Sequence, residues 1–161
     1  VSIEQVGTDY SRPHGKRFGT LVHSVLSLVA LDADTEGIAK VARVQGRVLG
    51  ANDEEVEAAV DTVAAVLRSE IIVRGSSAES DGRCRREVPV TVRLENDLII
   101  EGVVDLAYQR SDDGDVWTIV DYKTDFELGG RSEEYSRQVW LYALAISRAT
   151  GKKSRPVLLQ V

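Results

Sequence analysis

Two short segments, Gly102-Val103-Val104-Asp105-Leu106 and Asp121-Tyr122-Lys123-Thr124, flank the dense turn sequence Ser111-Asp112-Asp113-Gly114-Asp115. Both segments lie in β-rich runs, so the pattern predicts an antiparallel hairpin. Opposed residues in such a pair have a constant index sum. A hairpin centred on the middle of this turn has an index sum of 226 and sets Asp105 opposite Asp121. Directly opposed residues have Cβ atoms about 5 Å apart, whereas a bulge would shift the register by one residue.

A pair of carboxylates in this register needs a compensating charge, because like charges opposite one another in a sheet repel. A hard divalent cation such as Mg²⁺ supplies that charge, and it suits a site with few protein ligands plus water and phosphate. Side chains alternate along a strand, so Lys123 shares the face of Asp121 while Tyr122 points the other way. We expect Asp121 and Lys123 to project toward solvent or substrate. Lys123 would stabilise developing charge or help deprotonate an attacking water.

The alternative for Asp121 and Lys123 is a solvated pair on an exposed sheet face. An isolated Asp-x-Lys sequence would favour that interpretation. The presence of Asp105 in register favours a metal site.

Length and composition predict one globular domain. The chain has 161 residues, of which 43% are hydrophobic and 29% charged, as in ordinary folded proteins. No apolar run approaches the roughly 20 residues of a membrane span, and no signal peptide opens the chain, so we expect a cytoplasmic protein without a membrane partner. The single Cys84 excludes an intramolecular disulfide and a cysteine-ligated iron-sulfur cluster within this chain. The start at Val1, the lack of any Met and the end inside an apparent strand predict a domain excised from a larger protein.

The charge balance argues against a general nucleic-acid binder, since 20 Lys and Arg stand against 26 Asp and Glu, a net charge of −6. An enzyme that reaches phosphate through a metal needs only a local basic rim. Two clusters are candidates for that rim, or are ordinary solvated loops: Arg12, His14, Lys16 and Arg17, and Arg83, Arg85 and Arg86.

Hydrophobic periodicity predicts four helices and four strands after an irregular arm at residues 1–15. The helices are expected at residues 16–31, 35–48, 53–70 and 132–150, with Asn52 as the N-cap of the third. The strands are expected at residues 86–94, 98–109, 116–124 and 156–161. The Ser- and Gly-rich residues 75–82 are typical of a flexible loop. In the first strand Val88, Val90, Val92 and Leu94 should form the buried face, with Glu87 on the other.

Three further polar residues are candidates on helices. His23 falls roughly 130° from the centre of the apolar stripe of its helix, so it is a surface imidazole rather than a core histidine. Gln138 and Tyr142, at i and i+4, share a face. Alternatively, His23 has no role, Tyr142 is core packing and Gln138 caps a backbone group.

Five segments in order resemble the motif set of the RecB family of nucleases. This family is the branch of the PD-(D/E)XK superfamily found at the C-terminus of helicase-nucleases such as RecB and AddA. The segments are Gly19-Thr20-Leu21-Val22-His23, Glu87-Val88-Pro89, Gly102-Val103-Val104-Asp105-Leu106, Asp121-Tyr122-Lys123-Thr124 and Gln138-Val139-Trp140-Leu141-Tyr142. Each motif is weak alone, but five in the right order over residues 15–161 are a strong signal.

The resemblance implies roles for individual residues. It implies that His23, Asp105, Asp121 and the Tyr122 carbonyl are metal ligands and that Lys123 is the catalytic lysine beside Asp105 and Asp121. Gln138 and Tyr142 would line the site, Glu87 would match the family's acidic position, and Gly19 would allow close approach of the sheet or the strand. The lack of four cysteines indicates the type without an iron-sulfur cluster.

The resemblance also implies a fold and an activity. The fold would be mixed α/β, a restriction-endonuclease-like core with a central mixed sheet flanked by helices and extra N-terminal helices over residues 16–161. The activity would be Mg²⁺-dependent DNA hydrolysis, with Mn²⁺ as a substitute, in double-strand break processing and recombinational repair by a bacterial, nucleoid-associated enzyme. Its partners would be DNA, helicase domains of the same polypeptide and a second subunit. One rival hypothesis is a catalytically silent domain kept for DNA binding or assembly. A second is a metal-dependent enzyme that acts on another phosphoester.

Overall fold

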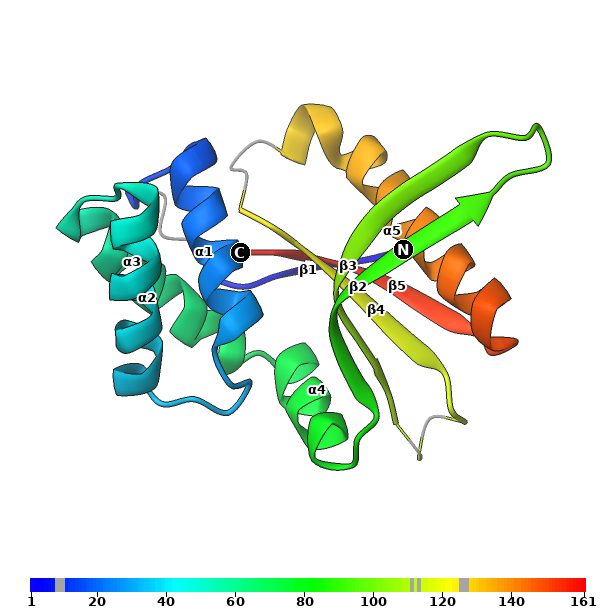
Figure 1. The fold of residues 1–161 in the computed structure, drawn as a ribbon, viewed down its shortest axis with the longest axis horizontal. Helices are drawn as coiled ribbons and strands as arrows, with labels where there is room; N and C mark the ends of the chain where they lie inside the picture. The colour runs from blue at the N-terminus through cyan, green and yellow to red at the C-terminus, as the bar shows by residue number, and fades with distance from the viewer. Residues whose placement is uncertain (8–10, 111, 113, 125–127) are drawn as a thin grey trace. The chain divides into compact units, whose positions relative to one another are not determined.

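The computed structural model describes residues 1–7, 11–110, 112, 114–124 and 128–161 (Figure 1). Its elements in chain order are β1 (Ser2–Gln5), α1 (Lys16–Leu28), α2 (Thr35–Leu49), α3 (Asp53–Leu67), α4 (Glu70–Ser80), β2 (Cys84–Arg93), β3 (Ile99–Gln109), β4 (Trp117–Lys123), α5 (Leu128–Thr150) and β5 (Ser154–Gln160). None of the helices in these described ranges is long and apolar enough to cross a membrane.

The chain divides into two compact units. The sheet unit comprises Val1–Glu4, Arg74–Asp121 and Glu127–Leu159. The helical unit comprises Gln5–Val73, Tyr122–Phe126 and Gln160–Val161. Strand β4 therefore passes from one unit to the other between Asp121 and Tyr122. The domain limits expected from the sequence, 1–15 and 16–161, stay a prediction.

The strands form one mixed sheet in the order β1-β5-β4-β3-β2. Strands β2, β3 and β4 are antiparallel neighbours. Strand β5 runs parallel to β4, because the N–H of Trp117 donates to the Lys153 carbonyl and the N–H of Val161 to the Lys123 carbonyl, each at 2.9 Å. A parallel neighbour requires a crossover connection, which α5 provides. This mixed sheet with flanking helices confirms the predicted fold class, a restriction-endonuclease-like core.

The register of β3 against β4 is the one predicted from the sequence. The pairs run from Leu106 opposite Val120 to Gln109 opposite Trp117, and all have the index sum 226. One step further along the same register places Asp105 opposite Asp121. The turn itself cannot be compared, since Ser111 and the expected centre, Asp113, lie outside the described residues.

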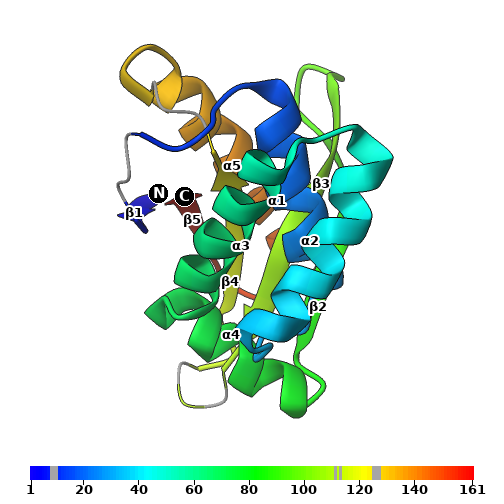
Figure 2. The same ribbon diagram turned by 90° about the vertical axis from the view of Figure 1, so that its left-hand side faces the viewer.

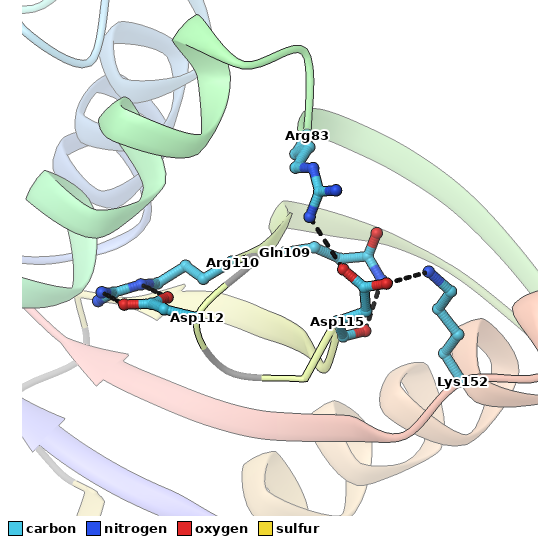
Figure 3. Close-up of polar contacts among 6 residues, drawn as sticks. All are labelled: Arg83, Gln109, Arg110, Asp112, Asp115 and Lys152. Carbon is cyan, nitrogen blue, oxygen red and sulfur yellow. Dashed lines mark hydrogen bonds and ion pairs between the residues drawn. The ribbon is translucent and has the colours of Figure 1, made fainter.

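The turn end of the β3–β4 hairpin is tied down by polar contacts around Asp115 (Figure 3). The Asp115 carboxylate accepts hydrogen bonds from Arg83, at 2.9 Å, and from Lys152, at 3.3 Å. Its backbone carbonyl accepts one from the side chain of Gln109. Both contacts lower the pKa of the Asp115 carboxyl, and the hydrogen bond from Lys152 has the larger effect. The hairpin is thereby fixed to the segments that precede β2 and β5, which helps to hold its register.

One face of the sheet unit packs on α5, which contacts β2 and β3 and crosses behind them in Figure 1. The core of this layer joins sheet residues to helix residues: Val90, Val92, Val104, Ala107, Ile119 and Leu158 with Val139, Tyr142, Ala143 and Ala145. The expected buried face of β2 is confirmed, because Val90 and Val92 belong to this core and Val88 and Leu94 pack against it.

In the helical unit, α1, α2 and α3 pack side by side (Figure 2). Helix α2 ends at Gly50, whose φ of 66° is a left-handed conformation that glycine adopts readily. Helix α3 begins at the predicted N-cap, Asn52, which forms a capping box with Glu55. The Glu55 carboxylate also accepts a hydrogen bond from Arg17, at 3.0 Å, so it ties the first turn of α1 to the first turn of α3.

The prediction of a flexible loop at residues 75–82 was wrong, because α4 continues to Ser80. Burial of Ile72 and Ala78 stabilises this helix. Gly75 lets α4 lie close to β3, since a Cβ there would be 3.2 Å from Leu106 and 3.3 Å from Tyr108. Tertiary packing therefore overrides the loop-like composition of the segment.

Two further predictions were wrong at the ends of elements. Part of the expected irregular arm is strand β1, whose side chains are all exposed, so hydrophobic periodicity could not reveal it. Helix α5 begins at Leu128 rather than at Ser132 and includes the two glycines that had been interpreted as a loop. The loop was inferred from the low helix propensity of glycine, which is a weak signal at the end of a helix.

We predict that Glu55→Gln lowers stability at neutral pH by about 1 kcal/mol, because glutamine can keep the capping box but loses the charge-assisted hydrogen bond from Arg17. Two hydrogen bonds lower the pKa of Glu55 below its ordinary 4.5. The one from Arg17 has the larger effect, and the one from the Asn52 N–H follows. A lowered carboxyl pKa stabilises the fold above the unfolded value and loses that effect as pH falls through the folded one. The difference between wild type and Glu55→Gln should therefore shrink below a pH of about 4.5.

Thermal unfolding followed from neutral to acidic pH measures this difference, with Glu57→Gln, an exposed neighbour on the same helix, as the matched control. A difference between wild type and Glu55→Gln that stays constant into strong acid would show that the ionised carboxylate of Glu55 is not the stabilising group.

Candidate active site

Three acidic residues lie in one row across neighbouring strands of the sheet unit. In the β2–β3 register, the pairs Arg86–Leu106 and Val88–Val104 flank Glu87 and Asp105, which places Glu87 opposite Asp105. The β3–β4 register, continued by one residue, places Asp121 opposite Asp105 on the other side. The sheet therefore aligns the three acidic positions that the sequence singled out.

The three acidic residues differ in their surroundings. Glu87 is exposed, Asp105 is half-buried and Asp121 is 3% exposed. The expectation was that Asp121 projects toward solvent or substrate, and projection to solvent was wrong, because the side chain is buried. Among the residues that the structure describes, no three His, Cys, Asp or Glu side chains come together as a metal-binding group. The three acidic residues therefore share a position along the strands without forming a side-chain cluster of this kind.

The backbone is irregular at this row. Val104 and Ala107 both belong to the core against α5, whereas Leu106 lies beside Gly75 of α4. Residues two apart on a regular strand share a face, so the alternation along β3 shifts between Val104 and Leu106. Glu87, opposite Asp105, has a left-handed backbone with φ of 50°. Irregularities of this kind re-aim side chains and are frequent beside active sites.

Asp121 belongs by alternation to the face of the sheet that packs on α5. It lies two residues beyond Ile119, which is in the core against α5. Asp121 is therefore on the α5 side of the sheet unit.

Gln138 and Tyr142 lie on the side of α5 that meets β3. The side-chain amide of Gln138 donates a hydrogen bond of 2.7 Å to the Tyr142 hydroxyl. The phenol lies directly over Gly102, three residues before Asp105, and Tyr142 is 6% exposed. The predicted shared face of these two side chains is confirmed, and they accompany Asp105 and Asp121 in the sheet unit.

His23 lies against the segment that follows Asp121. Within the helical unit, the rings of His23 and Tyr122 have centroids 6.0 Å apart and meet edge to face at 65°. The buried residues of α1 are Phe18, Gly19, Leu21, Val22, Val25 and Leu26, and His23 is half-buried beside them. The prediction that His23 lies off the apolar stripe is confirmed.

Gly19 allows α1 to approach the end of β4, as the sequence led us to expect. A Cβ at Gly19 would lie 2.6 Å from Oγ1 of Thr124, closer than real Cβ atoms come. Any larger residue would push α1 away from the residue that follows Lys123.

The backbone of β4 orients the Tyr122 carbonyl. The Lys123 carbonyl accepts a hydrogen bond from Val161. Successive carbonyls of a strand point to opposite edges, so the Tyr122 carbonyl points to the edge away from Val161. Its proposed role as a ligand agrees with this orientation.

Three arginines of the expected basic rims make internal contacts. Arg12 donates to Thr62, at 3.1 Å, and to the carbonyl of Val161. Arg17 pairs with Glu55, and Arg83 with Asp115, each at 2.9 Å. Their charges serve the fold, which the spacing of basic residues in the sequence could not reveal.

One position at the site was missed as a functional candidate: Gly102, which lies beneath the Tyr142 phenol. The available signal was a glycine within an otherwise apolar strand, which often marks a close approach of another group.

A mixed five-stranded sheet flanked by helices is the architecture of a restriction-endonuclease-like core. The family model for the PD-(D/E)XK nuclease superfamily matches residues 2–161, and the chain belongs to this superfamily.

Curated relatives are components of helicase-nucleases. The chain is 28% identical over 161 residues to an ATP-dependent helicase/nuclease subunit from Alkaliphilus metalliredigens, an alignment that covers 88% of this chain and 13% of the relative. It is also 28% identical over 156 residues to the protein of the same name from Thermoanaerobacter sp., covering 84% of this chain and 12% of that protein. The chain thus spans about one eighth of the length of these relatives.

Proposed function

We propose that this domain is a metal-dependent deoxyribonuclease that works within a helicase-nuclease polypeptide in double-strand break processing. The observation that carries this proposal is the β3–β4 register, which pairs Leu106 with Val120 and, if it continues by one residue, sets Asp105 opposite Asp121. Membership of the nuclease superfamily and the names of the relatives support it. Helicase domains of the same polypeptide would deliver DNA, and a second subunit would complete the complex.

The donor set fits Mg²⁺, with Mn²⁺ as a substitute. Asp121 is almost fully buried, and a buried carboxylate that faces a second carboxylate requires a compensating charge. Mg²⁺ takes oxygen ligands, uses one or two carboxylates and keeps several waters. Asp105, Asp121 and the Tyr122 carbonyl would hold it, and His23 would add an imidazole that suits Mn²⁺ better.

The residues of the site divide the work of phosphodiester hydrolysis. A Mg²⁺ ion held by Asp105 and Asp121 would supply Lewis-acid chemistry at the phosphoryl group and to the attacking water. The Lys123 ammonium stabilises the negative charge that develops on the phosphoryl oxygens. Gln138 and Tyr142 orient the DNA strand, and Glu87 supplies the acidic position at the far end of the row.

We predict that Asp121→Asn and Lys123→Ala each reduce DNA cleavage about a hundredfold or more. Asparagine keeps the volume of the buried side chain at position 121 and removes its charge, so the fold should survive. Without metal, the melting temperature of Asp121→Asn should hold or rise, because its repulsion with Asp105 is gone.

Cleavage of linear single- and double-stranded DNA with Mg²⁺, Mn²⁺ or chelator measures this, and thermal unfolding is recorded in parallel. Asp97→Asn and Lys40→Ala are matched controls, since both side chains are exposed and pair only locally, with Arg93 and Glu36. Wild type that binds DNA without cleaving it with any metal would identify the silent binding domain instead. A collapse of the melting temperature of Asp121→Asn would mean that a structural pair was mistaken for a catalytic one.

We predict that His23→Ala weakens metal activation and reduces the advantage of Mn²⁺ over Mg²⁺. Imidazole must be neutral to ligate, so activation of wild type should also weaken as pH falls through the histidine range near 6.5. Loss of this ligand should raise the half-saturating Mn²⁺ concentration roughly tenfold.

Titration of both ions into wild type and His23→Ala, with cleavage as the signal, tests the role of the imidazole. His14→Ala is the matched control, because His14 is exposed and is the other histidine of the chain. Equal half-saturating concentrations for wild type and His23→Ala with both metals would exclude His23 as a ligand.

A further inference from the structure

Helix α5 approaches β3 closely at a glycine. A Cβ built on Gly102 would lie 2.3 Å from the Tyr142 hydroxyl oxygen, 2.4 Å from Cε1 and 2.6 Å from Cζ. Real Cβ atoms essentially never come closer than 3.0 Å to other heavy atoms. The obstruction is an aromatic ring with 6% exposure, which has little space to move. Tyr142 therefore occupies its position only because residue 102 has no side chain.

We infer that Gly102 is a positioning residue that acts through Tyr142 by seating its phenol on β3. This inference rests on the proposed function, since the seat matters for activity only if the neighbouring carboxylates act on DNA. Gly102 is three residues before Asp105 on the same strand. Opposite it on β2 lies Val90, in the core that also contains Tyr142. The seat thus fixes the distance between the phenol and the carboxylate row.

The hydrogen bond from Gln138 determines the orientation of the Tyr142 O–H group. Because the Gln138 amide donates to the Tyr142 oxygen at 2.7 Å, the phenolic hydrogen must point elsewhere and can donate to an acceptor. The substrate acceptor available beside the carboxylate row is a phosphate oxygen of the DNA strand. Gly102 below and Gln138 beside the ring together aim the hydroxyl at that oxygen.

Other glycines show that the crowding at Gly102 is not simply the general packing of the chain. A Cβ at Gly75 would lie 3.2 Å from its nearest neighbour, a distance that small shifts can relieve. A Cβ at Gly46 would lie 2.5 Å from Cγ2 of Val56, between α2 and α3 in the helical unit. Gly46→Ala therefore introduces a comparable clash among residues with no proposed role in the site, and it serves as the matched control.

We predict that Gly102→Ala lowers kcat/KM about ten- to a hundredfold, the effect of losing one hydrogen bond to a charged group. Tyr142→Phe, which removes only the hydroxyl, should cause a loss of similar size. In a Tyr142→Leu background, which removes the ring and with it the clash, Gly102→Ala should cost less than about twofold further. Gly46→Ala should lower the melting temperature and leave kcat and KM of the folded protein unchanged.

A double-mutant cycle on the whole chain combines wild type, Gly102→Ala, Tyr142→Leu and the double variant. If the single losses multiply in the double variant, Gly102 does not act through Tyr142 and the inference fails. It also fails if Gly102→Ala cleaves DNA as well as wild type does. If Gly102→Ala does not fold, the double variant must fold, because its clash has been removed, and an unfolded double variant overturns the inference.

A second readout is independent of cleavage. The chain has five tyrosines, so incorporation of fluorotyrosine gives a small set of ¹⁹F resonances, and Tyr142→Phe identifies the one from Tyr142. Gly102→Ala should shift that resonance, and Gly46→Ala should not. If wild type binds DNA without cleaving it, the proposed function fails, and the same cycle is then measured by DNA affinity. An unshifted Tyr142 resonance in Gly102→Ala overturns the inference in either case.

Discussion

The pairing register of β3 with β4 is the constraint on which the candidate site depends. It pairs Leu106 with Val120, and its continuation by one residue would set Asp105 opposite Asp121. A slip of one residue would move every side chain of one strand to the other face. The register is held at the turn end by the contacts of Asp115 with Arg83 and Lys152 and by the buried pairs that follow. Contacts at the turn end thereby stabilise a register in which two carboxylates would face each other. A sheet without a bound cation would disfavour that arrangement.

Two glycines bring helices close to the strands of the site. In the sheet unit, Gly102 allows the Tyr142 phenol to rest on β3, and in the helical unit, Gly19 allows α1 to approach Thr124. Each contact places a polar candidate beside a strand: Tyr142 with Gln138 in the first case, and His23 next to Tyr122 in the second. The lack of a side chain at Gly102 and at Gly19 thus determines how closely the candidate side chains approach the strands.

The sequence predicted the parts of the fold that depend on local signals. The N-cap at Asn52, the helix expected at residues 35–48 and the index sum of 226 all follow from short-range patterns. It failed where packing between distant segments decides. Helix α4 has the composition of a loop, and β1 is recruited by the sheet edge without any apolar pattern. Likewise, the burial of Asp121 and the internal partners of Arg12, Arg17 and Arg83 depend on contacts that no local pattern records.

The most direct test of this account is the affinity of the metal for the opposed carboxylates, measured without DNA by calorimetric titration of Mn²⁺ into wild type and Asp105→Asn. Asp97→Asn, an exposed acidic residue of the β2–β3 turn, is the control. The account predicts one saturable site in wild type and in the control, and an affinity lowered at least tenfold in Asp105→Asn. Equal Mn²⁺ affinity in wild type and Asp105→Asn would contradict the claim that the β3–β4 register builds a metal site.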